Sequence, residues 1–485
     1  MARARQPFLR IARHELRILR AERTLRPVSA MLVVLLALAL WNGISWVSNQ
    51  KKTIESAFSE ENARFKRARH EVVHPLKQNA NVEARNDPRD PASFGATLGK
   101  RYAVLPPGPL ERLSIGQSDL YPYYLAVSTR SRDTFVHNDE IENPLNLLAG
   151  RFDTAFVIVY LFPLVILGLS FNLLSGEREQ GTMALLLSQP VALRSFAAGK
   201  IFSRAIVIVG LVVAVSVAGA IVAAPDAPAS IAVRTILWCL TVAAYAAVWF
   251  ALAVAVNASR MSSASNASAL LAVWLLLVII IPSSVTVAAQ SLYPVPSRVQ
   301  MIQAIRDASR EASTHGSQLL GRYFEDHPEL IPGGTSKAEI DNFNAQTYAV
   351  QEAVDRQVQP VLDRYDAQLL RQQSLVDRLK FLSPAIVTQE ALNRIAGTDL
   401  GRYRYFIAQV DRFHRKWKDY FNTRSVQKVP MTVDAIDAVP SFAFAEQPFS
   451  RVLLDVAVGL AGLFVPAFVI ALIASWRMRK YQPTS

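Results

Sequence analysis

The chain has 485 residues, and 51% of them are hydrophobic. Its formal net charge is +13, but many of the basic residues flank long apolar runs, which argues against nucleic acid as their partner. The single cysteine, Cys239, lies inside one of these runs, so a fold held by disulfides is excluded.

Six apolar runs are long enough to cross a bilayer, which takes about 20 mostly apolar residues. They are predicted at Val28–Val47, Phe152–Leu174, Ile201–Ala224, Ile231–Val256, Ala267–Ala289 and Val452–Trp476. Core helices of a soluble protein are usually shorter and alternate with polar faces, so the runs favour membrane spans. The first run lacks a convincing cleavage site, which argues against a removed signal peptide.

Basic residues beside the runs predict the orientation. Residues 1–27 hold eight arginines against two glutamates, and the tail 477–485 is also basic. The positive-inside rule therefore predicts that both ends are cytoplasmic, as an even number of spans permits. Within 1–27 the arginines take one side at helical spacing and apolar residues the other, which predicts an amphipathic helix at the membrane interface.

This topology leaves two large extracytoplasmic regions, 48–151 and 290–451. Apolar residues recur at helical spacing over 51–73 in the first region. The same spacing predicts helices over 299–323, 337–381 and 403–420 in the second. The predicted fold is thus an all-α membrane protein with six transmembrane helices, an N-terminal interfacial helix and a large, mainly α-helical extracytoplasmic domain.

A charged segment, residues 175–200, connects the second and third predicted spans on the cytoplasmic side. Within it, Gly181 and Thr182 break the chain and begin a short apolar helix that is too short to span. Such a helix offers apolar side chains to a groove of a partner protein, and Glu177 and Glu179 offer charges to its basic residues. The candidate docking residues are Glu177, Arg178, Glu179, Gly181, Thr182, Met183, Leu186, Gln189 and Pro190.

The pattern Glu-Arg-Glu-x-Gly-Thr at 177–182 resembles the coupling region of ABC-2 type transporter permeases. Residues 381–399 resemble a segment of those ABC-2 permeases with large extracytoplasmic insertions, which include gliding-motility and nitrous-oxide-reductase-maturation permeases. Locally, Ser383 and Pro384 predict the start of a helix, and Gly397 predicts its end.

The resemblance implies an ATP-driven exporter in a bacterial cytoplasmic membrane. It implies a dimer of this chain with a second permease, the same or homologous, on a cytoplasmic ABC ATPase subunit dimer that binds ATP and Mg. Membrane lipid and extracytoplasmic accessory proteins are further expected partners. The chain has no G-x-x-x-x-G-K-[ST] sequence, so we expect no ATPase site, cofactor or enzymatic activity of its own. A related hypothesis is a mechanotransmitting complex that moves the extracytoplasmic domain without a translocated cargo.

Few charged residues lie in or near the predicted spans. Arg204 and Arg234 are near span ends, and Asp455 is predicted to pair with Arg451, one helical turn earlier. A proton- or ion-coupled carrier is expected to place more ionisable groups at mid-depth, so this scarcity favours a carrier driven by a partner.

A different function is suggested by His70-Glu71-Val72-Val73-His74, which matches the zinc motif H-E-x-x-H. It predicts a membrane-anchored zinc metallopeptidase as the alternative. Pro75 and the cationic residues before His70 argue against zinc binding. Without zinc, the motif is the solvated end of a helix. The available third ligands are Glu83, His137 and Glu142.

Overall fold

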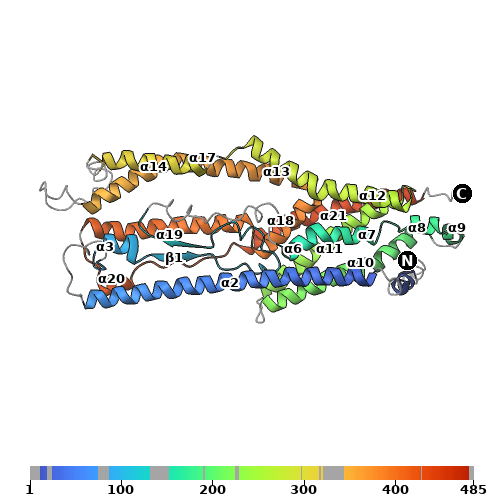
Figure 1. Cartoon of the computed structure of the whole chain (residues 1–485), viewed down its shortest axis with the longest axis horizontal. Coiled ribbons are helices and arrows are strands. Elements are labelled where there is room, and N and C mark those ends of the chain that lie inside the picture. The colour runs from blue at the N-terminus through green and yellow to red at the C-terminus, as the bar shows by residue number, and fades with distance from the viewer. Residues whose placement is uncertain are drawn as a thin grey trace.

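The computed structural model describes residues 11–18, 25–74, 87–130, 152–188, 192–223, 229–295, 298–315, 318–319, 343–427 and 429–479. The molecule is elongated, and most of its regular structure is helical (Figure 1). Long apolar helices gather toward one end, which we call the apolar half. The other end, the polar half, contains the more polar helices and a small sheet.

Five helices of the described chain are long and apolar enough to cross a membrane. They are α2 (Leu25–Val73), α10 (Leu193–Ala223), α11 (Ala229–Asn257), the continuous α12–η4–α13 (Ser263–Trp274, Leu275–Ile280, Ile281–Leu292) and α21 (Phe449–Arg479). Five of the six predicted runs therefore lie in helices of spanning length.

The second predicted run forms a shorter apolar helix, Thr154–Gly168, followed by turns up to Leu174. The helix consists of α6 (Thr154–Phe156), η3 (Val157–Leu161) and α7 (Phe162–Gly168). Asn257 of α11 binds the turns that follow: its amide nitrogen donates to the Ser170 carbonyl at 3.0 Å, and its oxygen accepts from the Leu174 N–H at 3.1 Å. These buried bonds replace the helical ones, so the chain leaves α-geometry before Leu174.

Helix α2 is longer than predicted. The sequence predicts a span over 28–47 and a separate helix over 51–73, whereas α2 joins the two without a break. Its 49 residues extend about 74 Å at 1.5 Å per residue. Glu61, buried on α2, accepts from Arg101 Nη1 at 2.6 Å and from the Tyr102 N–H at 2.7 Å, which fixes the sheet of the polar half to this helix.

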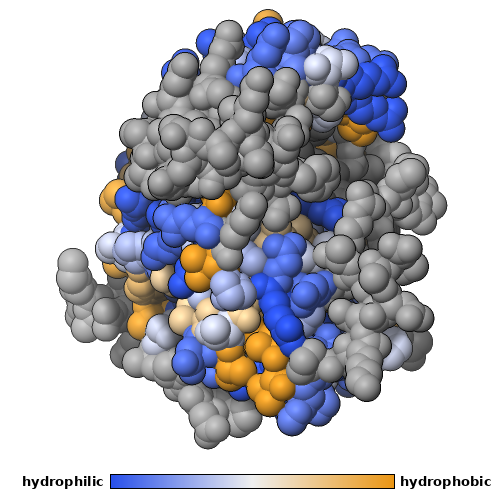
Figure 2. Space-filling view, turned by 90° about the vertical axis from the view of Figure 1, so that its left-hand side faces the viewer, coloured by the Kyte–Doolittle hydropathy of each residue, from blue (hydrophilic) through white to orange (hydrophobic). Residues whose placement is uncertain are grey.

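The polar half is built around an aromatic core. Its elements are α3 (Pro91–Ser93), η2 (Phe94–Leu98), the antiparallel strands β1 (Arg101–Val104) and β2 (Tyr124–Val127), α19 (Leu400–Val426) and α20 (Val433–Asp437). The largest core side chains are Phe65, Phe94, Phe406, Phe413, Trp417 and Phe421. Figure 2 shows this end of the molecule, where hydrophilic residues cover much of the described surface.

A helical hairpin of α14 (Arg298–Thr314) and α17 (Phe343–Leu379) lies along one side of the polar half (Figure 1). Small and β-branched residues join the two helices, among them Ala308, Ala312, Val354 and Val358. Lys418 of α19 holds the hairpin through an ion pair of 2.7 Å with Asp355. The hairpin continues the chain from α13, so it is joined to a spanning helix.

The described part of the predicted interfacial helix 1–27 includes a helical stretch at residues 11–18. It packs across the start of α10, where Ser203 Oγ donates to the Ala12 carbonyl at 2.9 Å. A Cβ on Gly199 would lie 2.7 Å from Ile11 Cγ2, so only glycine permits this approach. Arg13 and Arg17 remain exposed on the outer side.

Acid is expected to destabilise the polar half through His414. Burial, together with the charge of Lys418, lowers the pKa of His414 from 6.5 to about 4. Smaller effects that raise this pKa include the Arg130 carbonyl, which accepts from Nε2 at 2.9 Å, and the charge of Asp355. The unfolded chain binds the proton more tightly, so the stability contribution is complete above about pH 6.5 and is lost as the pH falls toward 4. The full loss is about 3 kcal/mol.

The thermal unfolding midpoint, followed by tryptophan fluorescence, should therefore decrease when the pH is lowered from 7 to 5. His414→Gln should flatten this dependence, and His315→Gln, at an exposed histidine, should leave it unchanged. A slope that persists in His414→Gln would assign the effect to other groups.

Candidate functional site

The charged segment after the second run folds into two short helices, α8 (Ser175–Glu179) and α9 (Thr182–Leu187). They lie at the end of the apolar half farthest from the polar half (Figure 1). Gly181 connects them with a φ of 74°, a left-handed conformation that favours glycine. Met183 is buried in the apolar core, whereas Leu185 of α9 is 69% exposed.

Glu177 attaches α8 to α10 and to the start of α9. Its carboxylate accepts from Lys200 Nζ at 2.6 Å and from the Thr182 hydroxyl. Lys200 Nζ also lies 3.6 Å from Glu15 in the helical stretch 11–18. Partial burial opposes ionisation of Glu177, but the bonds from Lys200 and Thr182 and the Lys200 charge hold its pKa below the ordinary value.

Arg178 and Glu179 attach α8 to the turn between α11 and α12. The Arg178 guanidinium donates to the carbonyls of Arg260 and Met261, each at 2.6 Å. The Glu179 carboxylate accepts from the N–H and the hydroxyl of Ser263, each at 2.7 Å, and so caps the first turn of α12. Its pKa is lowered, chiefly by the Ser263 N–H.

The structure thus brings Glu177, Arg178, Glu179 and Thr182 together, but it engages the two carboxylates within the chain. These contacts give the carboxylates a positioning role, and their interpretation as charges for a partner stays a prediction. Gln189 and Pro190 lie outside the described residues, as does the side chain of Leu186. Ser263 and Lys200, which hold α8 from 84 and 23 residues away, carry no local signal in the sequence that would identify them.

A second polar cluster surrounds α18 (Pro384–Ala396), which follows the short η6 (Lys380–Leu382). The sequence places 290–451 outside the membrane, yet α18 packs with the apolar half, against α11, α21 and η4. Its ends agree with the prediction. Ser383 Oγ accepts from the N–H groups of Ala385 and Ile386, and Gly397 ends the helix with a φ of 78°.

Ser383 also donates its hydroxyl proton to the Leu277 carbonyl in η4. In a π-helix such as η4, the carbonyl of each residue accepts from the N–H five residues later. For Leu277 that residue is Pro282, which has no N–H, so the carbonyl needs a donor from outside the helix. One hydroxyl therefore caps α18 and completes the hydrogen bonding of a spanning helix.

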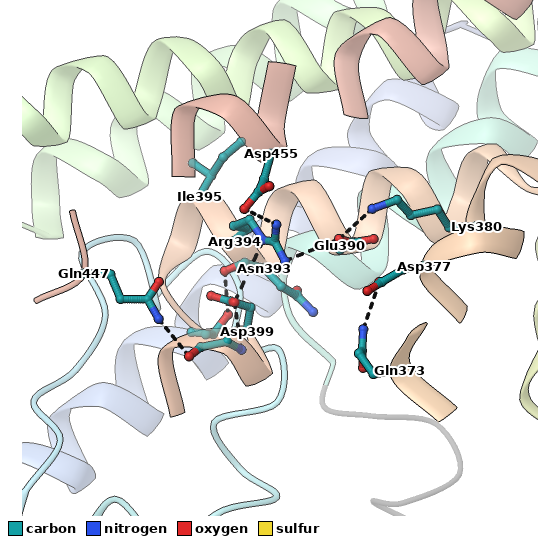
Figure 3. Close-up of polar contacts among 12 residues, drawn as sticks. Gln373, Asp377, Lys380, Glu390, Asn393, Arg394, Ile395, Asp399, Gln447 and Asp455 are labelled. Atoms are coloured by element: carbon teal, nitrogen blue, oxygen red, sulfur yellow. Dashed lines mark hydrogen bonds and ion pairs between the residues drawn. The ribbon is translucent and has the colours of Figure 1, made fainter. Parts of the chain in front are cut away.

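Arg394 joins α18 to α21 through an ion pair with Asp455 (Figure 3). Glu390 lies 3.5 Å from Arg394 and 2.9 Å from Lys380, which extends the cluster to η6. The predicted pair of Asp455 with Arg451 is wrong. Asp455 pairs with α18 instead, because the tertiary fold packs α18 against α21.

Arg234 fixes the C-terminal end of α18. It is only 9% exposed and donates to the Ile395 carbonyl at 2.7 Å. A cation at the end of a helix satisfies its last carbonyls and opposes the negative end of its dipole. Helix α18 is therefore attached to three spanning helices, by Ser383 to η4, by Arg394 to α21 and by Arg234 to α11.

Ser383→Ala should destabilise the protein by about 2 kcal/mol, because it removes a helix cap and leaves a buried carbonyl without its donor. Ser383→Thr keeps the hydroxyl and should retain most of the stability. The measurement is the thermal unfolding midpoint in detergent, with Ser374→Ala, at an exposed serine of α17, as the matched control. Equal midpoints for Ser383→Ala and the control would contradict this role.

The H-E-x-x-H residues lie at the end of α2 in the polar half. His70 and His74 are exposed, with ring centroids 5.1 Å apart. Glu83, His137 and Glu142, the available third ligands, lie outside the described residues. Within the described residues, no group of three or more His, Cys, Asp or Glu side chains is arranged to hold a metal ion.

A known family model matches part of the chain. The model of a domain of unknown function, DUF3526, matches residues 298–445, which include α14, α17, α18 and α19. No curated protein matches the chain.

Proposed function

We propose that this chain is the permease subunit of an ABC-2 type ATP-driven exporter in a bacterial cytoplasmic membrane. A separate ATPase dimer supplies the energy, and a second permease chain completes the transporter. The observation that carries the proposal is the attachment of α8: Glu177 binds α10, while Arg178 and Glu179 bind the start of α12. A displacement of α8 would therefore be transmitted to several spanning helices at once.

In this proposal α9 is the coupling helix that docks into the ATPase. Met183 anchors it in the apolar core, while Leu185 is directed into solvent and is free of the core. Burying a leucine in a partner's groove contributes about 1.5–3 kcal/mol before the costs of association. The charged residues of α8 hold the coupling helix at a fixed place on the spans.

Movement of α8 has a direct path to the polar half. Glu179 holds the first turn of α12, and α12–η4–α13 leads into the α14–α17 hairpin. Ser383 connects η4 to α18, and Arg394 continues the path to α21. Rigid helices and hydrogen-bonded joints of this kind carry coupling between distant sites.

A mechanotransmitting complex without translocated cargo is the second candidate. It is favoured by α2, a single helix that continues from the apolar half into the polar half. ATP-driven tilting of such a helix moves the polar half directly. Both candidates use the same coupling segment.

The proposal is tested by affinity purification of the intact chain from its native membrane. An ABC ATPase should co-purify, and the complex should hydrolyse ATP with Mg. Recovery of the folded chain without any ATPase, under mild extraction, contradicts the proposal.

The proposed orientation predicts which positions face the outside. In a Cys239→Ala background, single cysteines replace Ser59 on α2, Ser374 on α17 and Ser188 after α9, all exposed positions. An impermeant thiol reagent on intact spheroplasts should label positions 59 and 374, and position 188 only after permeabilisation. Labelling of position 188 in intact spheroplasts would show that the proposed orientation is wrong.

A further inference from the structure

A groove of about 940 Å³ runs along the apolar half between α10, α11 and α21. Small residues such as Gly210, Ala247 and Ala471 contribute to its lining, together with Phe202 and Phe468. Phe468 is 70% exposed and Phe202 is 45% exposed, so the groove opens sideways onto the face expected to meet lipid. Its lining is apolar except for Arg194 and Ser475.

The polar and apolar parts of the groove are separated along its length. Arg194 and Ser475 lie with Met478 near the α8–α9 end, which is cytoplasmic in the proposed topology. The far end of the groove is lined by Val213, Ala243 and Phe464, which lie at the middle of the predicted spans 201–224, 231–256 and 452–476. The groove therefore covers the cytoplasmic leaflet and stops near the middle of the membrane.

We propose that this groove binds one anionic phospholipid of the cytoplasmic leaflet, with its headgroup at Arg194 and an acyl chain against Gly210 and Ala247. An acyl chain fills one leaflet, as the groove does, whereas a helix of a second copy would cross the full depth. Arg194 supplies the positive charge that an anionic headgroup requires. The proposal rests on the orientation given above and not on ATPase docking.

Gly210 offers a way to fill the groove without disturbing the fold. A Cβ at Gly210 meets nothing within 4 Å, and the same holds for Gly168 at the end of α7, which does not line the groove. Gly210→Phe should therefore occupy the acyl-chain site, and Gly168→Phe is its matched control. Ala247→Leu, on the opposite wall, is a second filling variant should Gly210→Phe fail to fold.

The experiment incorporates the full chain into nanodiscs of equal phosphatidylglycerol and phosphatidylcholine, and native mass spectrometry then identifies the lipids that stay bound. The parent protein should retain phosphatidylglycerol, Gly210→Phe should lose it, and Gly168→Phe should keep it. Arg194→Gln should reduce the preference for phosphatidylglycerol about fivefold, the effect of one cation near an anionic surface. Arg451→Gln, at the other end of α21, should leave it unchanged.

Three outcomes would overturn the proposal. The first is equal retention of phosphatidylglycerol by the parent and both filling variants, and the second is retention of the two lipids without preference. The third is loss of a dimer without loss of lipid in Gly210→Phe, which would make the groove an interface between copies. The assay contains no ATPase, so failure of the proposed function leaves its result unaffected.

Discussion

Leu185→Asp is expected to abolish co-purification of the ATPase and the hydrolysis that the permease stimulates. Leu185 is 69% exposed on α9, so the substitution breaks no core contact of the chain itself. In the docked complex the aspartate removes about 1.5–3 kcal/mol of apolar burial and brings an unpaired charge into the partner's groove. Together these effects weaken binding at least a hundredfold, since each 1.4 kcal/mol is a factor of ten.

The complex is measured by affinity purification and by ATP hydrolysis of the recovered material. Val429→Asp is the matched control, because Val429 is an exposed apolar residue of the polar half and should leave the complex intact. Both variants should insert into the membrane in equal amounts. An undiminished complex with Leu185→Asp would place docking outside α9.

Arg178→Ala is expected to weaken the coupling between ATP hydrolysis and motion of the polar half. The substitution removes both bonds to the turn before α12, each a charge-assisted bond of 2.6 Å, and leaves the exposed side of α9 unchanged. The ATPase should still bind and hydrolyse ATP. Its movement should reach α12 and the α14–α17 hairpin only in part, because the two bonds between Glu179 and Ser263 remain.

The readout is the distance between spin labels at positions 59 on α2 and 374 on α17, in the Cys239→Ala background with the ATPase bound. ATP should change this distance in the parent protein and should change it much less in Arg178→Ala. Arg178→Lys, which cannot bind two carbonyls in the same forked geometry, should give an intermediate change. Arg356→Ala, at an exposed arginine of α17, is the control. A full distance change in Arg178→Ala would show that the turn before α12 is not the route.

Local signals in the sequence were sufficient for much of the fold. Hydropathy located five helices of spanning length, because a run of apolar residues needs no knowledge of its neighbours to be recognised. The caps of α18 were equally local. Ser383 accepts from N–H groups two and three residues later, and Gly397 ends the helix through its own left-handed conformation. The same holds for Gly181, whose left-handed conformation separates α8 from α9.

The tertiary structure alone decided the partners of the polar and charged side chains. Glu179 binds Ser263 across 84 residues, and Ser383 binds Leu277 across 106, and neither spacing has a sequence signature. Asp455 has Arg451 one turn away, yet it pairs with Arg394 because α18 packs against α21. The shortening of the second run depends likewise on Asn257 of another helix. Periodicity and capping are short-range properties of the chain, whereas the partner of a buried polar group is fixed only when distant helices pack.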